Sequence, residues 1–287
     1  MTDTATSRRM RLLEALAQES HGRDLETLAA SLGCDDRTLR RDVDYLHELL
    51  SRVRGVEVRR GRVLARRGPT PAGYFADHLG HRADQKKAIA RAVASSLQDD
   101  LAVVLTAGTT NYYVACEIRR RVLETERPRN LTAFTNSLPA LIELMAAGIA
   151  TGVVGEVYNE DDCAFHSHEY RSAFHPMLAV VGASGLVADV ASGSLDLYSH
   201  RAEEALFMRQ LLEPVPEIVV ATSPDKIGRR HPWCFSSAAL LAGKTVRLVT
   251  CRLEDPVRER MAAFAASAKR AGLDFRIEEG DATPSDA

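Results

Sequence analysis

The sequence predicts an α/β protein in two parts: an N-terminal winged helix-turn-helix and a larger C-terminal domain built on a mostly parallel sheet. Two observations carry this prediction. Short helical patterns joined by a glycine precede residue 50, and apolar runs of five or six residues alternate with helical patterns after residue 83. The first arrangement is typical of a helix-turn-helix, and the second of parallel strands covered by helices on both faces.

The bulk properties fit a two-domain globular chain. It has 287 residues, of which 45% are hydrophobic and 26% are charged, so a sizeable core can form. Its five cysteines are scattered and form no Cys-x-x-Cys pair, which favours free thiols in a reducing compartment. No signal-peptide pattern and no apolar run of the roughly 18 residues that span a membrane is present. We therefore expect a cytoplasmic protein with no membrane partner.

Charge is distributed unevenly along the chain. The first 68 residues carry 14 arginines and no lysine against 11 acidic residues, whereas the remainder has five more acids than bases. A basic N-terminal part is where a polyanion would bind, and arginine suits bidentate contacts to phosphate and guanine.

The N-terminal domain is expected over residues 8–68. Asp24 is predicted to cap a short helix, Gly33 to form the turn after it, and Asp35 to cap a second helix with basic residues near its start. Two short strands around a turn at Arg60-Gly61 would form a basic wing. Such a domain binds a double-stranded DNA operator through the second helix and the wing. The side chains expected to contact DNA are Arg37, Thr38, Arg40, Arg41, Arg59, Arg60 and Arg62.

The remaining chain is divided into a linker over 69–82, an α/β effector-sensing domain over 83–278 and a disordered tail over 279–287. Glycine and proline without periodicity mark the linker. The apolar runs that predict strands of the sheet lie at 101–106, 131–135, 151–155, 178–182, 217–222 and 245–250.

Small hydroxyl residues and glycines follow these strands, and a lysine follows the fifth. Ligands of parallel sheets bind in the loops at the carboxyl ends of the strands. Backbone N–H groups at helix N-termini would face an anion there, with the lysine as a point charge. The residues expected to bind a small phosphorylated effector are Thr106, Gly108, Thr109, Thr110, Thr135, Asn136, Ser137, Gly155, Glu156, Gly182 and Lys226.

The run Thr38-Leu39-Arg40-Arg41-Asp42-Val43 resembles the helix-turn-helix of DeoR-type transcription regulators, although regulators with WYL-type sensor domains use nearly the same motif. The order of Gly-Thr-Thr, Thr-Asn-Ser, Gly-Ala-x-Gly and Lys-x-Gly after successive strands resembles the DeoR-type effector domain, which is related to the ribose-5-phosphate isomerase fold. The resemblance covers about residues 8–278. It implies a repressor, a sugar phosphate as effector, and a homo-oligomer, dimer or tetramer.

The chain departs from the family pattern at acidic positions. Thr106-Ala107 stands in place of Asp-Ser, Gly155-Glu156 in place of Gly-Gly, and Met177 and Ser223 each in place of an aspartate. The loops of the phosphate type are kept better than the carboxylates that would accept from sugar hydroxyls. The effector is therefore expected to be atypical, or the pocket to have lost its ligand.

Three alternatives to a regulator that senses a sugar phosphate stay open. The effector is a nucleotide or another phosphorylated molecule, or the chain binds DNA constitutively with a vestigial pocket, or the chain is an isomerase-like enzyme. An isomerase-like enzyme would need a carboxylate base and a lysine, for which Glu156, Asp225 and Lys226 are the candidates. We expect no enzymatic activity, because a DNA-binding domain has no evident use in such an enzyme.

A loop rich in cysteine and histidine carries Cys163, His166, His168 and His175. These are zinc-ligand types, but the spacing fits no common structural zinc site. We expect a polar flap over the ligand pocket, and neither a metal nor another cofactor.

Overall fold

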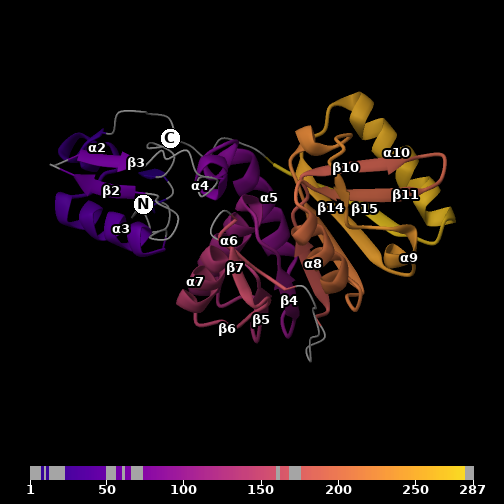
Figure 1. Cartoon of the computed structure of the whole chain (residues 1–287), viewed down its shortest axis with the longest axis horizontal. Coiled ribbons are helices and arrows are strands. Elements are labelled where there is room, and N and C mark those ends of the chain that lie inside the picture. Colours follow the sequence, from indigo (N-terminus) through magenta and orange to yellow (C-terminus); the bar gives the residue numbers. More distant parts are fainter. Residues whose placement is uncertain are drawn as a thin grey trace. The chain divides into compact units, whose positions relative to one another are not determined.

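The computed structural model describes residues 8–9, 11–12, 23–49, 56–59, 62–65, 74–159, 162–167 and 176–281 (Figure 1). Contacts divide the chain into two units, Met1–Ala83 with Asn159–Cys163, and Asp84–Tyr158 with Ala164–Ala287. Within the described ranges no helix is both long and apolar enough to cross a membrane.

Two helices joined by a tight turn form the centre of the first unit. They are α2 (Leu25–Ser31) and α3 (Asp36–Leu49). The Asp24 carboxylate accepts the Thr27 N–H at 3.1 Å at the start of α2, and the Asp35 carboxylate accepts the Thr38 N–H at 2.6 Å at the start of α3. Between them Gly33 has a φ of +65°, a conformation that glycine adopts without steric cost. Both predicted caps and the predicted glycine turn are thus confirmed.

A small antiparallel sheet accompanies these helices. Its strands β1 (Arg23–Asp24), β2 (Val56–Arg59) and β3 (Arg62–Ala65) lie in the order β1-β3-β2, and Arg59 pairs with Arg62. The two expected strands are present, and β1 was not predicted. The turn at 60–61, which includes Arg60, lies outside the described residues.

Asp42 anchors the first unit from the inner face of α3. Its side chain is only 2% exposed, and its two oxygens accept from Arg8 Nε at 2.5 Å and Arg9 Nε at 2.7 Å. The Arg9 guanidinium also lies 3.5 Å from the ring centroid of Tyr45, which adds a cation–π contact. The aspartate that follows Arg40 and Arg41 therefore has a structural role, in contrast to the exposed arginines before it.

Replacing Asp42 with asparagine should destabilise the first unit by about 2–3 kcal/mol, because two largely buried guanidinium groups lose their carboxylate. Hydrogen exchange of the α3 amides, measured in the full chain at increasing urea, would report this locally. Asp44→Asn is the matched control, since Asp44 lies on the same helix and is exposed. Equal α3 protection in the two variants would contradict the anchoring role.

One correction concerns the predicted linker at 69–82. Helix α4 (Tyr74–Leu79) lies within it. Phe75 and Leu79, one helical turn apart, are both buried. A single apolar pair gives too short a pattern to stand out beside the glycines and prolines before it.

The second unit is built on a seven-stranded sheet in which every pair of neighbours is parallel, as predicted. The strand order is β15-β14-β12-β9-β4-β5-β6. Their bounds are β4 (Ala102–Leu105), β5 (Thr132–Thr135), β6 (Ala150–Val153), β9 (Leu178–Val181), β12 (Glu217–Ala221), β14 (Thr245–Cys251) and β15 (Asp274–Gly280).

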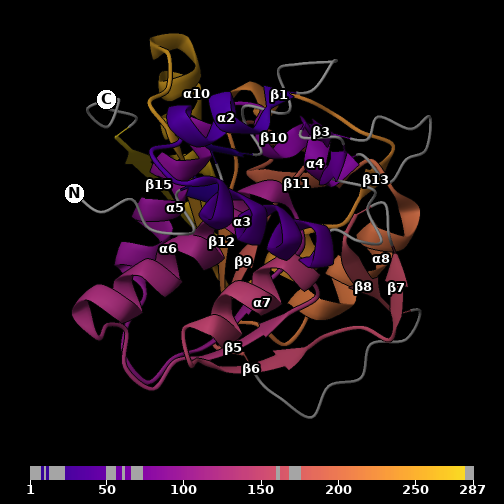
Figure 2. The same ribbon diagram turned by 90° about the vertical axis from the view of Figure 1, so that its left-hand side faces the viewer.

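Helices cover both faces of this sheet (Figure 1). On one face lie α5 (Ala83–Ser96), α6 (Thr109–Thr125) and α7 (Leu138–Ala146), with α6 and α7 side by side (Figure 2). On the other face α8 (Ala202–Leu212) and α10 (Asp255–Arg270) contribute Phe207 and Phe264 to a core that includes residues of β4, β9, β12 and β14.

The segments after β6 and β9 correct the expectation of simple alternation between strands and helices. A hairpin of β7 (Val157–Asn159) and β8 (Ala164–His166) follows β6, and β10 (Gly185–Asp189) and β11 (Ser194–Ser199) follow β9 directly. A third antiparallel strand, β13 (Trp233–Cys234), pairs with β11. Two short helices, η2 (Pro224–Lys226) and α9 (Ala238–Leu241), lie between β12 and β13 and between β13 and β14.

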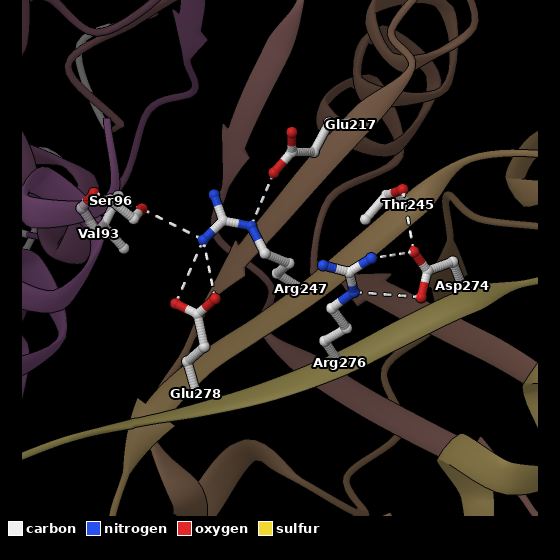
Figure 3. Close-up of polar contacts among 8 residues, drawn as sticks. All are labelled: Val93, Ser96, Glu217, Thr245, Arg247, Asp274, Arg276 and Glu278. Atoms are coloured by element: carbon white, nitrogen blue, oxygen red, sulfur yellow. Dashed lines mark hydrogen bonds and ion pairs between the residues drawn. The ribbon is translucent and has the colours of Figure 1, made fainter. Parts of the chain in front are cut away.

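Arg247 fixes α5 to the amino half of the sheet (Figure 3). Its side chain on β14 is 10% exposed and binds Glu217 of β12 at 2.7 Å and Glu278 of β15 at 3.0 Å. The same guanidinium donates to Ser96 Oγ, in the last turn of α5, at 3.2 Å. One arginine thus joins three strands and the end of one helix.

The boundary of the predicted disordered tail at 279 is also corrected. Glu279 and Gly280 pair with Thr250 and Cys251 as the last residues of β15. The Glu279 carboxylate accepts from Arg258 and from the Leu253 N–H, and these bonds hold its pKa below the ordinary value. Residues 282–287 lie outside the described residues.

Candidate functional site

The loops singled out in the sequence follow five strands that are contiguous in the sheet. Their order β12-β9-β4-β5-β6 brings all five carboxyl ends to one edge. After β4 the chain forms β5 and then β6 on one side of β4. Strands β9 and β12 follow on the other side of β4. The strand order therefore reverses between β4 and β9, and such a switch point is where open parallel sheets bind ligands.

The turn from β4 into α6 ends at the N-terminus of a 17-residue helix. Gly108 is its N-cap, with a φ of +130° and no side-chain cap, and Thr109 and Thr110 are its first residues. The first N–H groups of a helix have no partner within it, and here no capping side chain occupies them. They carry the positive end of the helix dipole, so this N-terminus is suited to a phosphate group.

Thr106 differs from the other residues of this turn, because its side chain is buried and hydrogen-bonded within the protein. It is 1% exposed, and its Oγ1 accepts from Asn111 Nδ2 at 3.0 Å and from the Gly182 N–H at 3.4 Å. Asn111 also donates to the Thr106 and Val180 carbonyls, so it ties β4 to β9 across the switch point. Asn111 was not predicted from the sequence, and its position in the first turn of α6 was the available signal.

The turn from β5 into α7 is likewise closed by its own bonds. Ser137 Oγ accepts the Ala140 N–H at 3.3 Å, and Thr135 Oγ1 accepts the Ser137 N–H at 3.0 Å. Asn136 accepts the Ala107 N–H at 2.7 Å and donates to the Phe165 carbonyl at 3.1 Å. All three predicted residues are buried, and Asn136 braces the β4 turn through Ala107.

Two predicted loops precede strands instead of helices. Gly155, with a φ of +105°, leads into β7, and a Cβ there would lie 2.8 Å from the Phe165 carbonyl carbon. Glu156 is exposed. Gly182 leads through Ser184 into β10. The Ser184 Oγ lies 2.9 Å from His200 Nδ1. These two loops therefore offer no helix N-terminus to an anion.

The loop after β12 supplies charge to the same edge. Lys226 ends η2, and its N–H donates to the Ser223 carbonyl at 3.1 Å. The Asp225 carboxylate accepts from Ser223 Oγ at 2.6 Å and lies 3.5 Å from Arg229 Nη2. The cation predicted from the sequence is thus present at the carboxyl ends of the strands, next to a carboxylate that already has partners.

Residues 81–242 match the family model of the DeoR C-terminal sensor domain. The chain belongs to this family. The resemblance stated from the strand-end motifs is therefore confirmed for the sensor part of the chain. No curated protein matches the chain in sequence at a significant level.

Solved structures resemble the chain loosely. Ribose 5-phosphate isomerases from Plasmodium falciparum and Methanocaldococcus jannaschii each give a TM-score of 0.37, at 14% and 17% identity over 50% of this chain. These matches span 52% and 54% of the isomerases, about half of their length. The δ subunit of eIF2B from Chaetomium thermophilum gives 0.35 at 10% identity, over 83% of this chain and 92% of that one. Similarity at this level says nothing about activity.

Helix α3 precedes the DeoR sensor domain in the sequence. The residues of α3 that are predicted to contact DNA lie near the start of this helix. Arg37, Arg40 and Arg41 are exposed, and Thr38 is partly buried. Hydrogen bonds from the Thr38 backbone and hydroxyl lower the pKa of the Asp35 carboxyl. Arg59 and Arg62 are in β2 and β3, and only their backbone is described.

Part of the cysteine- and histidine-rich loop of the sensor domain lies outside the described residues, including His168 and His175. Within the ranges that are described, no group of three or more His, Cys, Asp or Glu side chains is arranged to hold a metal ion.

Proposed function

We propose that this chain is a DNA-binding transcription regulator, a repressor, whose sensor domain binds a small phosphorylated metabolite. The observation that carries the proposal is the DeoR sensor domain at 81–242, which follows in the sequence a helix with three exposed arginines near its start. Sensor domains of this family are parts of regulators, and exposed arginines at the start of α3 suit a helix that lies in the major groove.

The effector in this proposal is a sugar phosphate. Its phosphate is bound by the backbone N–H groups at Gly108, Thr109 and Thr110, with Lys226 as the counter-charge. The uncapped start of α6 at the switch point supports this assignment. Thr106, Asn136 and Ser137, whose side chains are hydrogen-bonded within the protein, support the turn before α6 and make no direct contact with the phosphate.

Ligand binding would change the arrangement of DNA-binding parts in a homo-oligomer, a dimer or tetramer, and thereby the affinity for the operator. A ligand acts in this way only if it binds one arrangement more tightly than the other. The proposal is that the sugar phosphate favours the arrangement with the weaker DNA affinity.

Fluorescence anisotropy of a labelled duplex from upstream of the gene tests both parts. The full chain should bind this duplex at least about 1,000-fold more tightly than a scrambled duplex at the same salt concentration. One class of phosphorylated compound should then weaken binding at least about tenfold, and the same compound without its phosphate should not.

The other outcomes have defined meanings. A response to nucleotides instead of sugar phosphates would change the effector class. Operator binding that no phosphorylated compound affects would mean a constitutive DNA binder. Failure to distinguish the two duplexes would refute the proposal that the chain is a DNA-binding regulator.

A further inference from the structure

Four aspartates lie at the start of α3 or along its first turns, and three of them have structural roles. Asp35 caps the helix, and Asp42 is buried against two arginines. Asp36 is the first residue of α3, where a carboxylate interacts favourably with the helix dipole. Asp44 is exposed and has no such role.

Asp44 belongs to an exposed stripe of α3 that is otherwise basic. Arg37, Arg40, Arg41 and Asp44 are exposed and stand at positions i, i+3, i+4 and i+7, which lie on one face of a helix. At 3.6 residues per turn, Arg40 and Arg41 fall on either side of Asp44, and Arg37 is almost in line with it two turns earlier. Asp44 therefore occupies the centre of the face that the proposed function places in the major groove.

The neighbouring arginines leave this carboxylate without an ion pair. Among the residues that the structure describes, Asp44 is joined to neither Arg40 nor Arg41, the basic residues one turn before it. The Arg41 guanidinium donates instead to Thr38 Oγ1 at 3.4 Å, toward the start of the helix. A base that precedes an acid at this spacing is also the less favourable order for a pair within a helix. The Asp44 carboxylate is thus open to a ligand of the basic face.

The chemistry of a carboxylate restricts the DNA base that it can bind. Both oxygens of an ionised aspartate are acceptors only. In the major groove guanine presents two acceptors, thymine presents an acceptor and a methyl group, and adenine presents an acceptor beside its amino group. Cytosine presents the N4 amino donor and no acceptor. Cytosine is therefore the base whose edge suits Asp44.

We propose that Asp44 is a specificity-determining residue that accepts a hydrogen bond from the N4 amino group of a cytosine in the operator. The inference rests on the proposed function in that α3 lies in the major groove, and it adds the base that one side chain reads. The arginines around Asp44 supply affinity for any DNA. The carboxylate reduces that affinity by repelling phosphates, and only a cytosine at the right position offsets the loss.

Anisotropy titrations of the full chain test this, with the operator duplex and a set of duplexes in which each base pair is replaced in turn. For the wild-type chain, replacing at least one C·G pair by T·A should weaken binding about tenfold or more. In Asp44→Ala the cost of that replacement should fall at least about fivefold. Any cost from an arginine that binds the guanine of the same pair remains in the variant, so the difference measures the carboxylate.

Two further variants separate base reading from a change of charge. The amide of Asp44→Asn has a donor and an acceptor that match adenine, so this variant should prefer adenine where the wild type prefers cytosine. Glu26→Ala is the matched control, because it removes an exposed carboxylate from α2 of the same unit. Its relative affinities for the substituted duplexes should equal those of the wild type. Alanine is a better helix former than aspartate, so Asp44→Ala should keep α3 intact.

The inference is overturned if no C·G pair shows this cost in the wild type, or if Asp44→Ala or Asp44→Asn keeps the wild-type preference for cytosine. It is also overturned if Asp44→Ala binds every duplex more tightly by the same factor, because the carboxylate would then only repel phosphates. The proposed function survives these outcomes as long as the wild-type chain prefers its operator to the scrambled duplex. Absence of that preference would refute the regulator and this inference together.

Discussion

Replacing both Arg40 and Arg41 with alanine is expected to lower the affinity for the operator about 100-fold or more. Both side chains are exposed near the start of α3, on a helix whose other face buries Leu39 and Val43. An arginine contact to a base or a phosphate contributes about 1–3 kcal/mol, so two of them account for such a loss.

The salt dependence of binding gives the sharper measurement. If both arginines neutralise phosphates, the slope of log K against log salt should become shallower by roughly 2 in the double variant. Arg129→Ala with Arg252→Ala is the control, because it removes the same net charge from exposed positions of the sensor domain. Unchanged affinity and slope in the Arg40 and Arg41 variant would show that α3 is not the helix that binds DNA.

Much of the fold was predictable because the local sequence pattern of many elements agrees with the burial and bonding of those elements in the folded chain. Strands such as β9, with the buried run Leu178–Val181, lie inside a sheet covered on both faces, so apolar residues occupy consecutive positions. The caps at Asp24 and Asp35 were predictable for a similar reason, since the side-chain oxygen bonds within its own turn.

The hairpin of β10 and β11 was missed although its signal was present. In β11 the buried Leu195 and Leu197 alternate with Ser194 and Asp196, and Gly193 has a φ of +69° at the turn before them. Period-two alternation was overlooked because the preceding strands are continuous apolar runs.

The site itself was only partly predictable, because the sequence shows residue types but not which bonds they already make. Ser137 and Gly108 both begin helices after strands, yet the Ser137 hydroxyl caps its own helix and Gly108 leaves its N–H groups uncapped. Lys86 of α5, which is 8% exposed, illustrates the reverse case. A lysine in a helical pattern is expected on the solvated face, and its burial follows from the position of α5 over β14.

The second large effect is expected when Gly185 is replaced, and it concerns the stability of the sensor domain. A Cβ at this position would lie 2.3 Å from the carbonyl oxygen of Arg229 and 3.0 Å from its carbonyl carbon. Backbone cannot move aside as a flexible side chain can, so Gly185→Ala should push the segment after Lys226 away from β10. That segment is held by the Gly228 N–H, which donates to the Leu186 carbonyl at 2.6 Å. The expected cost is about 3 kcal/mol.

Thermal unfolding of the full chain measures this cost, with the transition of the sensor domain expected about 6–10 °C lower in Gly185→Ala. Gly182→Ala is the matched control from the same turn, because the nearest atom to its added Cβ is the Ala107 carbonyl oxygen at 3.9 Å. Its melting temperature should stay within about 2 °C of the wild type. Equal melting temperatures would mean that the close approach of Arg229 to β10 does not hold the strand-end loops in place.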